Sequence, residues 1–278
     1  MLPVAHVLPH ALDARADAAR VAGDLSRLRH GRSILRAGGS MSESTSAHRN
    51  HLGQPIGPPL PGWTARPRPP HTPMEGRLVR LEPLDLDRHA KALHEAYAED
   101  AEGRNWTYLP YGPFPSAEAW AATMQAVQKL TDVIFHAIVV ADSGRPVGVA
   151  AYLRIEPGMG VIEVGHLSYA PALQRSPAAT EAMYLMMRRA FEELGYRRYE
   201  WKCDSLNAPS RRAALRLGFR FEGIFRQMMV IKGRSRDSAW FSIVDGEWPA
   251  LRAAFERWLD PSNFDAKGVQ LARLEDLR

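Results

Sequence analysis

The segment from Gln174 to Thr180 joins an apolar strand to a long amphipathic helix, and its residue types suit an anion. Ser176 is a good N-cap, and Pro177 fits the first helical position because its missing N–H has no partner there. A helix N-terminus directs unpaired N–H groups and a partial positive charge at one spot, which favours a phosphate. The small side chains of Ala178 and Ala179 leave room for a bulky anion. An ordinary helix cap is the alternative.

Length and composition indicate a globular protein with a substantial core. The chain has 278 residues, of which 45% are hydrophobic and 24% charged. No apolar run approaches the roughly 18 residues that span a bilayer. The single cysteine, Cys203, excludes an internal disulfide and a cysteine-based metal cluster, and it favours a reducing, cytoplasmic compartment. No metal-ligand spacing occurs in the sequence, so no metal is expected.

The net charge of +5 is concentrated near the N-terminus. Residues 1–75 hold nine basic and five acidic residues, whereas the remainder holds 27 basic and 26 acidic residues. A nucleic-acid-binding domain would carry its own basic face, so nucleic acid is not expected as a partner.

Three regions differ in composition. Residues 1–73 are expected to form a disordered or extended leader, whose first forty residues either belong to the protein or reflect an over-long start at Met1 rather than Met41. Its Pro-rich part, residues 53–73, favours an extended linker or a strap lying on the domain, with Trp63 as a candidate anchor. Residues 74–260 form the expected domain, and residues 261–278 a polar C-terminal tail.

Hydrophobic periodicity and turn residues predict one α/β (α+β) domain with a single mixed, mostly antiparallel sheet flanked by helices. Period-two alternation predicts strands at residues 77–82, 134–140, 147–155, 161–169 and 199–203, and a hairpin of residues 219–230 and 238–244 around Lys232-Gly233. Caps and apolar stripes predict helices at residues 88–98, from residue 116 onward, and at 177–194, 207–218 and 248–259.

Three motifs in this order resemble the GNAT superfamily of acyl-CoA N-acyltransferases, and specifically its branch of Rim-type (ribosomal-protein) N-terminal acetyltransferases. Ile162-Glu-Val-Gly165 leads into Tyr169-Ala-Pro171, and Thr180-Glu181-Ala182 opens a helix. Asn207-Ala-Pro-Ser210 is followed by Ala214-Leu-Arg-Leu-Gly-Phe219. The resemblance covers residues 74–259 and implies the GNAT fold.

The resemblance implies a coenzyme pyrophosphate at the segment from Gln174 to Thr180. Members of the superfamily place glycines there, whereas this chain has Gln174-Arg-Ser-Pro-Ala-Ala179. Pro177 removes a donor, and a positive φ would strain an alanine. The amides of Ala178, Ala179 and Thr180 can still face the anion, and Arg175 can add a charge. The departure allows weaker or altered coenzyme binding, or its loss.

The resemblance also implies direct transfer of an acetyl group to an amine. The strand of Glu163 would separate from the strand of Trp201, and the pantetheine arm of acetyl-CoA would lie in the gap. Glu163 would be the general base, directly or through water. A carboxylate in a surface ion pair is its alternative role.

Two residues of the helix at 207–218 have roles implied by the family. Ser210 would donate a proton to the leaving thiolate or hydrogen-bond it, and the alternative is a local bond to the backbone. Asn207 would contact the pantetheine, cap the helix, or do both. The full set of residues expected to contact the coenzyme comprises Leu167, Ser168, Tyr169, Gln174, Arg175, Ser176, Ala178, Ala179, Thr180 and Asn207.

An aromatic loop lies where the resembled fold binds the acceptor. Trp106, Tyr108 and Tyr111 are expected either to hold an apolar or cationic amine or to cover the edge of the core. His136 and His166 are expected to be packed, hydrogen-bonded core histidines.

The sequence therefore predicts an acetyl-CoA-dependent N-acetyltransferase acting on a protein N-terminus or a small-molecule amine in a ternary complex. The alternative is a non-catalytic GNAT-like module that binds acyl-CoA or a partner protein. No membrane partner is expected. The hairpin at residues 219–244 could offer an edge through which two copies pair as a homodimer.

Overall fold

The computed structural model describes residues 48–130 and 132–278, in two separate compact units. In the smaller unit, the described residues 48–64 contain a two-stranded antiparallel ladder of β1 (His48–Arg49) and β2 (Pro55–Ile56). The larger unit contains residues 65–278. The question of an over-long start concerns residues 1–40, which lie outside the described residues.

An eight-stranded sheet forms the centre of the larger unit, in the order β3-β4-β5-β6-β7-β8-β10-β9. Neighbouring strands are antiparallel except for β7 and β8, which are parallel. The mixed, mostly antiparallel sheet is as predicted. The strands are β3 (Met74–Glu75), β4 (Val79–Pro83), β5 (Ile134–Val140), β6 (Pro146–Glu156), β7 (Val161–Tyr169), β8 (Arg198–Asp204), β9 (Arg220–Ile231) and β10 (Arg234–Val244).

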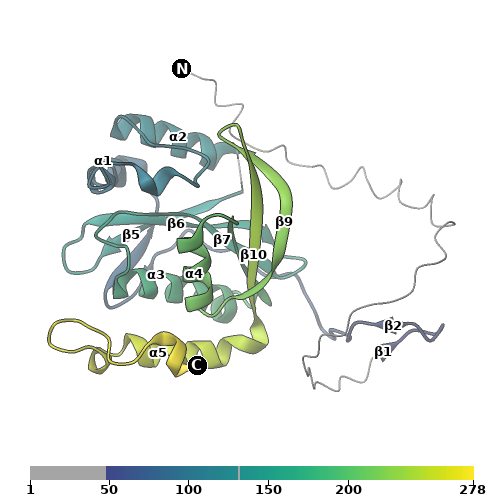
Figure 1. Ribbon diagram of the computed structural model, residues 1–278. Helices are drawn as coiled ribbons and strands as arrows, with labels where there is room; N and C mark the ends of the chain where they lie inside the picture. The colour runs from purple at the N-terminus through teal and green to yellow at the C-terminus, as the bar shows by residue number, and fades with distance from the viewer. Residues whose placement is uncertain (1–47, 131) are drawn as a thin grey trace. The chain divides into compact units, whose positions relative to one another are not determined.

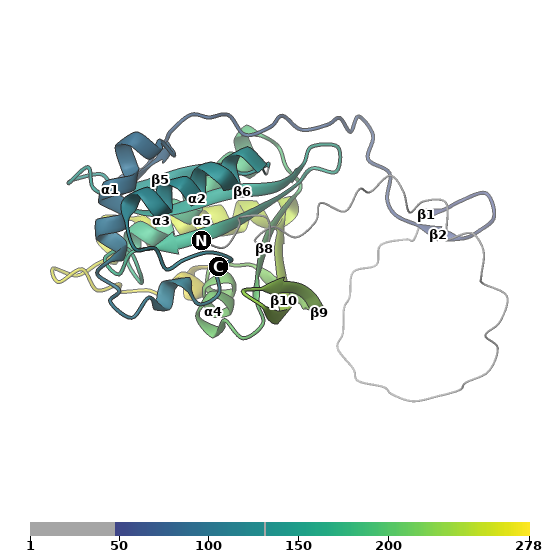
Figure 2. The same ribbon diagram turned by 90° about the horizontal axis from the view of Figure 1, so that it is seen from above.

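Helices cover both faces of this sheet (Figures 1 and 2). On one face lie α1 (Leu86–Tyr97) and α2 (Ala117–Leu130); on the other lie α3 (Pro177–Arg188) and α5 (Trp248–Leu259). The short helix α4 (Ala208–Arg216) follows β8. A hydrogen bond joins the sheet to α3: the Tyr152 hydroxyl of β6 donates to the carbonyl oxygen of Met186 at 2.7 Å. The ends of β7 and β8, where the sequence motifs lie, are therefore placed between the two helical layers.

Local sequence explains where α3 begins and how it is fixed. Ser176 caps it and Pro177 opens it, as predicted. The Glu181 carboxylate accepts hydrogen bonds from the backbone N–H groups of residues 77–79, which ties α3 to β4. The helix continues as a π-helical turn (Arg189–Glu193) and ends at Gly195, whose φ is 69°.

The hairpin of β9 and β10 differs from the sequence expectation in one respect. Its second strand was expected from Ser238, but β10 begins at Arg234, directly after the two-residue turn Lys232-Gly233. Both turn residues have positive φ, at 49° and 73°, which matches the twist of a tight hairpin. The polar residues 234–237 concealed this part of the strand because they lack apolar alternation.

Both ends of the larger unit are packed against it. Residues 261–278, expected as a polar tail, contain 3₁₀ turns at Pro261–Asn263 and Leu274–Leu277, and Leu274 is buried in the core. At the other end, residues 65–73 contact the domain as a strap, since the carbonyl oxygens of Thr72 and Pro73 accept hydrogen bonds from Arg189.

Within the described part of the chain, no helix is both long and apolar enough to cross a bilayer.

Candidate functional site

The sheet opens between β7 and β8. The two strands pair from Val161, opposite Arg198, to Val164, opposite Trp201, and the pairing then stops. Both strands continue, β7 to Tyr169 and β8 to Asp204. Their backbone groups beyond Val164 and Trp201 therefore border a gap in the sheet.

A bulge in β7 orients the backbone at this gap. His166 has a φ of 50°, and the register with β6 shifts there. The N–H of Ala170 donates to the carbonyl oxygen of Val147, on the β6 side, at 2.8 Å. Because successive N–H groups of a strand point in opposite directions, those of Tyr169 and Leu167 point toward the gap. Ser168 instead pairs with Val149 of β6.

The glycine-free segment before α3 adopts the backbone conformation that usually calls for glycine. Arg175, an exposed residue, has a φ of 57°. The Ser176 Oγ accepts a hydrogen bond from the Ala179 N–H and donates one to the Leu173 carbonyl oxygen. Within the described residues the Ala178 N–H has no acceptor. A turned backbone followed by a free amide can receive an anion.

A cation that sequence reasoning missed lies at the start of α3. Arg216 of α4 donates from Nη1 to Thr180 Oγ1 at 3.0 Å. Its guanidinium lies 4.8 Å from the centre of the Trp258 ring. Burial lowers the pKa of Arg216. No local pattern could have revealed this contact, because its two residues come from different helices.

The start of α4 holds Ser210 beside the gap. Asn207 caps α4, its Oδ1 accepting from the Ser210 N–H at 3.1 Å. The Trp201 indole Nε1 donates to Ser210 Oγ at 3.0 Å. The indole occupies one acceptor site of the hydroxyl, whose proton can be donated to the neighbouring Cys203 sulfur or to a bound ligand. Burial raises the pKa of the neighbouring Cys203 thiol.

Glu163 lies between two cations on the opposite face of the sheet from Trp201. Its side chain is buried and contacts Arg154 Nη1 at 2.7 Å and Lys202 Nζ at 2.8 Å. Lys202 Nζ also contacts Glu200 at 2.7 Å. The ion pairs expected as the alternative role of Glu163 are thus present, although they are buried rather than at the surface. Lys202 and Arg154 were not anticipated from the sequence.

The aromatic loop contacts the segment after β8 and the turn of the β9–β10 hairpin. Trp106 and Tyr111 are buried in the core. Tyr108 reaches out, and its hydroxyl donates to the Leu206 carbonyl oxygen between β8 and α4 at 3.2 Å. Lys232, in the hairpin turn, donates to the Trp106 carbonyl oxygen at 2.7 Å. Tyr108 is therefore the member of the predicted aromatic set that lies nearest the outside.

The two strand histidines are packed, as expected. His166 Nδ1 hydrogen-bonds the Tyr111 hydroxyl at 3.0 Å, and burial lowers the pKa of His166 to about 4. His136 is fully buried, and burial lowers its pKa to about 3. His136 departs from the expectation in one way, since neither ring nitrogen has a hydrogen-bond partner among the described residues.

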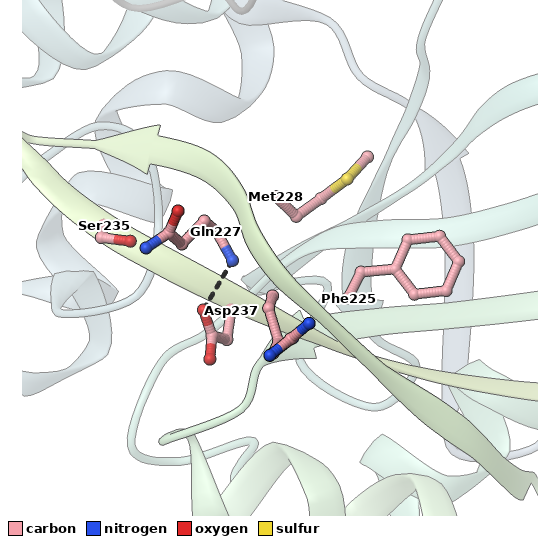
Figure 3. A pocket seen from close by; sticks show the side chains of 6 residues that line it. Phe225, Gln227, Met228, Ser235 and Asp237 are labelled. Atoms are coloured by element: carbon pink, nitrogen blue, oxygen red, sulfur yellow. Dashed lines mark hydrogen bonds between the residues drawn. The ribbon is translucent and has the colours of Figure 1, made fainter. Parts of the chain in front are cut away.

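A hollow of about 740 Å³ lies on the β9–β10 hairpin, at a bulge where Gln227 has a φ of 49° (Figure 3). The Gln227 N–H donates to Asp237 Oδ1 at 2.7 Å across it. None of the residues expected to act in the site lines this hollow, which is bounded by Phe225, Arg226, Gln227, Met228, Ser235 and Asp237.

Comparisons with known proteins agree with the fold. The family described as "Acetyltransferase (GNAT) domain" matches residues 78–220. A GCN5-related N-acetyltransferase from Brucella melitensis is 48% identical, with 78% of this chain and 99% of that chain covered and a TM-score of 0.76. A probable GNAT-family acetyltransferase from Chromobacterium violaceum is 42% identical over 71% of this chain and 98% of its own, with a TM-score of 0.67.

More distant relatives carry less information. An uncharacterised N-acetyltransferase of Bacillus subtilis is 23% identical over 55% of this chain and 87% of its own length. A ribosomal-protein-serine acetyltransferase from Vibrio cholerae is 19% identical over 62% of this chain and 97% of its own, with a TM-score of 0.53. At that identity the likeness shows the fold and does not assign the branch.

Proposed function

The chain belongs to the GNAT acetyltransferase family, and we propose that it transfers the acetyl group of acetyl-CoA to a primary amine, in a ternary complex. The acceptor is a protein N-terminus, as in the Rim-type branch, or a small-molecule amine. The observation that carries this proposal is the end of β7–β8 pairing at Val164 and Trp201, directly beside Ser210. A strand-like pantetheine arm requires such an opening.

The residues around the opening fit acetyl-CoA. The free N–H of Ala178 and the turned backbone at Arg175 suit its pyrophosphate, and Arg216 adds a positive charge nearby. The N–H groups of Leu167 and Tyr169, directed into the gap, suit its amide groups or its carbonyl oxygen. Gln174 and Ser176 of the expected set hold this backbone in place, since their side chains donate to the carbonyl oxygens of Tyr169 and Leu173.

When bound, acetyl-CoA supplies the thioester that is cleaved. The amine nitrogen forms the new C–N bond while the C–S bond breaks. Glu163 accepts the proton that the amine loses, directly or through water, and its contacts with Lys202 and Arg154 hold the carboxylate in place for that role. Ser210, oriented by Trp201, donates a hydrogen bond to the departing thiolate sulfur, or passes it a proton that it regains from water.

The test of the proposal is thiol release from acetyl-CoA, measured against a panel of peptides and small amines. Turnover on at least one amine is expected. Tight coenzyme binding by calorimetry without turnover on any amine would favour the non-catalytic module, and absence of both would refute the proposal.

Replacing Ser210 by Ala separates catalysis from binding. We expect kcat to fall by about 100-fold, because a positioned proton donor contributes 10²- to 10⁴-fold, while the Kd for CoA changes little. Ser262→Ala is the matched control, since Ser262 lies on the C-terminal segment and, among the described residues, bonds Asp260 alone. Equal kcat values for Ser210→Ala and the parent would remove Ser210 from the mechanism.

A further inference from the structure

A row of three polar side chains on β10 is left without partners. Arg236, Ser238 and Trp240 alternate along the strand and so share one face. Each has a polar atom that is closed to solvent and has no hydrogen-bond partner within the described residues: Nε of Arg236, Oγ of Ser238 and Nε1 of Trp240. A buried polar group without a partner costs about 1–3 kcal/mol, so three in a row call for an explanation.

The charge of Arg236 makes this row unusual. Within the part of the chain that the structure describes, no carboxylate lies within ion-pair distance of Arg236, although its side chain is partly buried. The other cations on the same face form ion pairs, since Arg154, Lys202 and Arg198 each contact at least one glutamate. Burial lowers the pKa of Arg236. Asp204 and Glu163 attract the guanidinium from beyond ion-pair distance, so a bound anion in direct contact would relieve more of its desolvation cost.

The row lies one strand away from the gap between β7 and β8, because β8 separates β10 from it. Ser238 lies opposite Asp204 and Trp240 opposite Lys202, on the part of β8 that has left β7. Lys202 lies over the Trp240 ring, with Nζ 3.7 Å from the ring centre, and the same Nζ contacts Glu163. The row therefore shares a sheet face with the proposed base, whereas Trp201, which bonds Ser210, faces the other side of the sheet.

We propose that Arg236, Ser238 and Trp240 form an acceptor subsite that binds a carboxylate carried by the amine substrate. This inference rests on the proposed acetyl transfer and names the class of its acceptor.

The hydrogen-bonding capacity of the row selects a carboxylate. Arg236 and Trp240 can only donate, and Ser238 can donate its hydroxyl proton. A carboxylate accepts several such bonds, and the planar guanidinium matches its two oxygens. A cationic or purely apolar acceptor would leave all three donors unsatisfied. Ordering the acceptor by its carboxylate on this face would present its amine toward the side where Glu163 lies.

The experiment compares kcat/KM for matched acceptors that differ in one carboxylate. One arm uses the C-terminally amidated dipeptides Ala-Asp and Ala-Asn, and the other uses alanine and alaninamide; the arms distinguish a side-chain carboxylate from an α-carboxylate. In at least one arm we expect the carboxylate acceptor to be preferred by about 10- to 100-fold, the range of a charged hydrogen-bonded contact. Equal use within both pairs would overturn the proposal.

Arg236→Gln should abolish that preference by lowering kcat/KM for the carboxylate acceptor alone, without altering the Kd for CoA. Arg236→Lys should restore only part of it, because lysine keeps the charge without the planar fork. Ser238→Ala provides a second, milder variant if Arg236→Gln folds poorly. Arg226→Gln, an exposed residue of β9 with the same change of charge, is the matched control.

Failure of the subsite can be distinguished from failure of the proposed reaction. If no amine is acetylated, calorimetric binding of amidated Ala-Asp to the CoA-saturated protein replaces the kinetic readout. Binding that weakens in Arg236→Gln supports the subsite. No binding by the parent, or equal loss of carboxylate and amide acceptors in Arg236→Gln, refutes it.

Discussion

At the level of single residues, His136 is a buried base whose protonation opposes folding. It is fully buried, and neither ring nitrogen has a partner among the described residues. Burial, followed by the nearby positive charge of Arg189, lowers the pKa of His136 from 6.5 to about 3. Below pH 6.5 the unfolded chain therefore binds a proton that the native protein does not, and stability is lost as the pH falls toward 3.

We expect His136 to contribute a loss of about 2 kcal/mol of unfolding free energy between pH 7 and pH 5, since each pH unit below 6.5 costs about 1.4 kcal/mol. Urea unfolding of the parent and of His136→Leu at both pH values measures it, and the variant should lose about 2 kcal/mol less. His51→Leu, at an exposed position, is the control. Equal pH dependence in all three proteins would show that His136 does not titrate as described.

Residues of the site that act through local geometry could be predicted from the sequence. Ser176 and Asn207 cap their helices as expected, because an N-cap bonds a backbone N–H only three residues away. Contacts between elements could not be predicted. The indole of Trp201 on Ser210, and the two cations on Glu163, arise from strand register and the bulge at Arg154, which no spacing in one sequence encodes.

At the level of elements, the aromatic loop depends on a glycine that supports Trp106. Gly112 has a φ of 74°, and a Cβ there would lie 2.6 Å from the Trp106 ring. Gly144 has a similar φ of 65° but open space around it. Alanine substitutions at these two glycines therefore separate the free-energy cost of backbone strain from that of steric overlap.

We expect Gly144→Ala to cost about 1 kcal/mol of unfolding free energy, from the left-handed backbone alone. Gly112→Ala should cost about 3 kcal/mol, because the methyl group must also displace a packed ring. Denaturant unfolding compares the two. If the two losses of unfolding free energy agree within 0.5 kcal/mol, roughly the error of such measurements, the loop moves to accommodate the methyl group without loss of packing.

Helices and strands were predicted well where periodicity and caps agreed, and poorly where the apolar alternation was missing. The stripe and caps of α3 marked it clearly, and its π-helical end still fell within the predicted range. The start of β10 was missed because residues 234–237 are polar, yet hairpin pairing with β9 extends the strand through them. Tertiary pairing thus overrode local preference.

At the level of the whole molecule, the order of strands and helices sufficed to predict the sheet. What it left open was the sheet's outer edge, where β9 exposes large apolar side chains, including Phe221, Ile224, Phe225 and Val230. Long apolar edges favour pairing with another chain, so a homodimer through β9 stays a prediction. Sedimentation of the parent and of Val230→Lys tests it, and a parent that is monomeric at all concentrations would contradict it.

The last feature at this scale is the strap of residues 65–73, which the sequence left open as linker or strap. Arg189 is buried, and its two terminal nitrogens donate to the carbonyl oxygens of Thr72 and Pro73, each at 2.8 Å. Its Nε contacts Glu193 at 3.1 Å. The strap thus supplies the hydrogen-bond acceptors for the two terminal nitrogens of Arg189, and the rest of the domain supplies the acceptor for Nε.

A chain of residues 74–278 should therefore be less stable than one of residues 65–278, by about 3 kcal/mol, because hydrogen bonds to a charged group contribute about 1.5–3 kcal/mol each and water replaces part of them. Urea unfolding of both chains, each with and without Arg189→Met, forms a double-mutant cycle. If the strap acts through Arg189, its removal should cost the Arg189→Met protein about 1 kcal/mol or less. An undiminished cost in that background would mean that the strap stabilises the domain by other contacts, such as the pairing of Arg68 with Asp132.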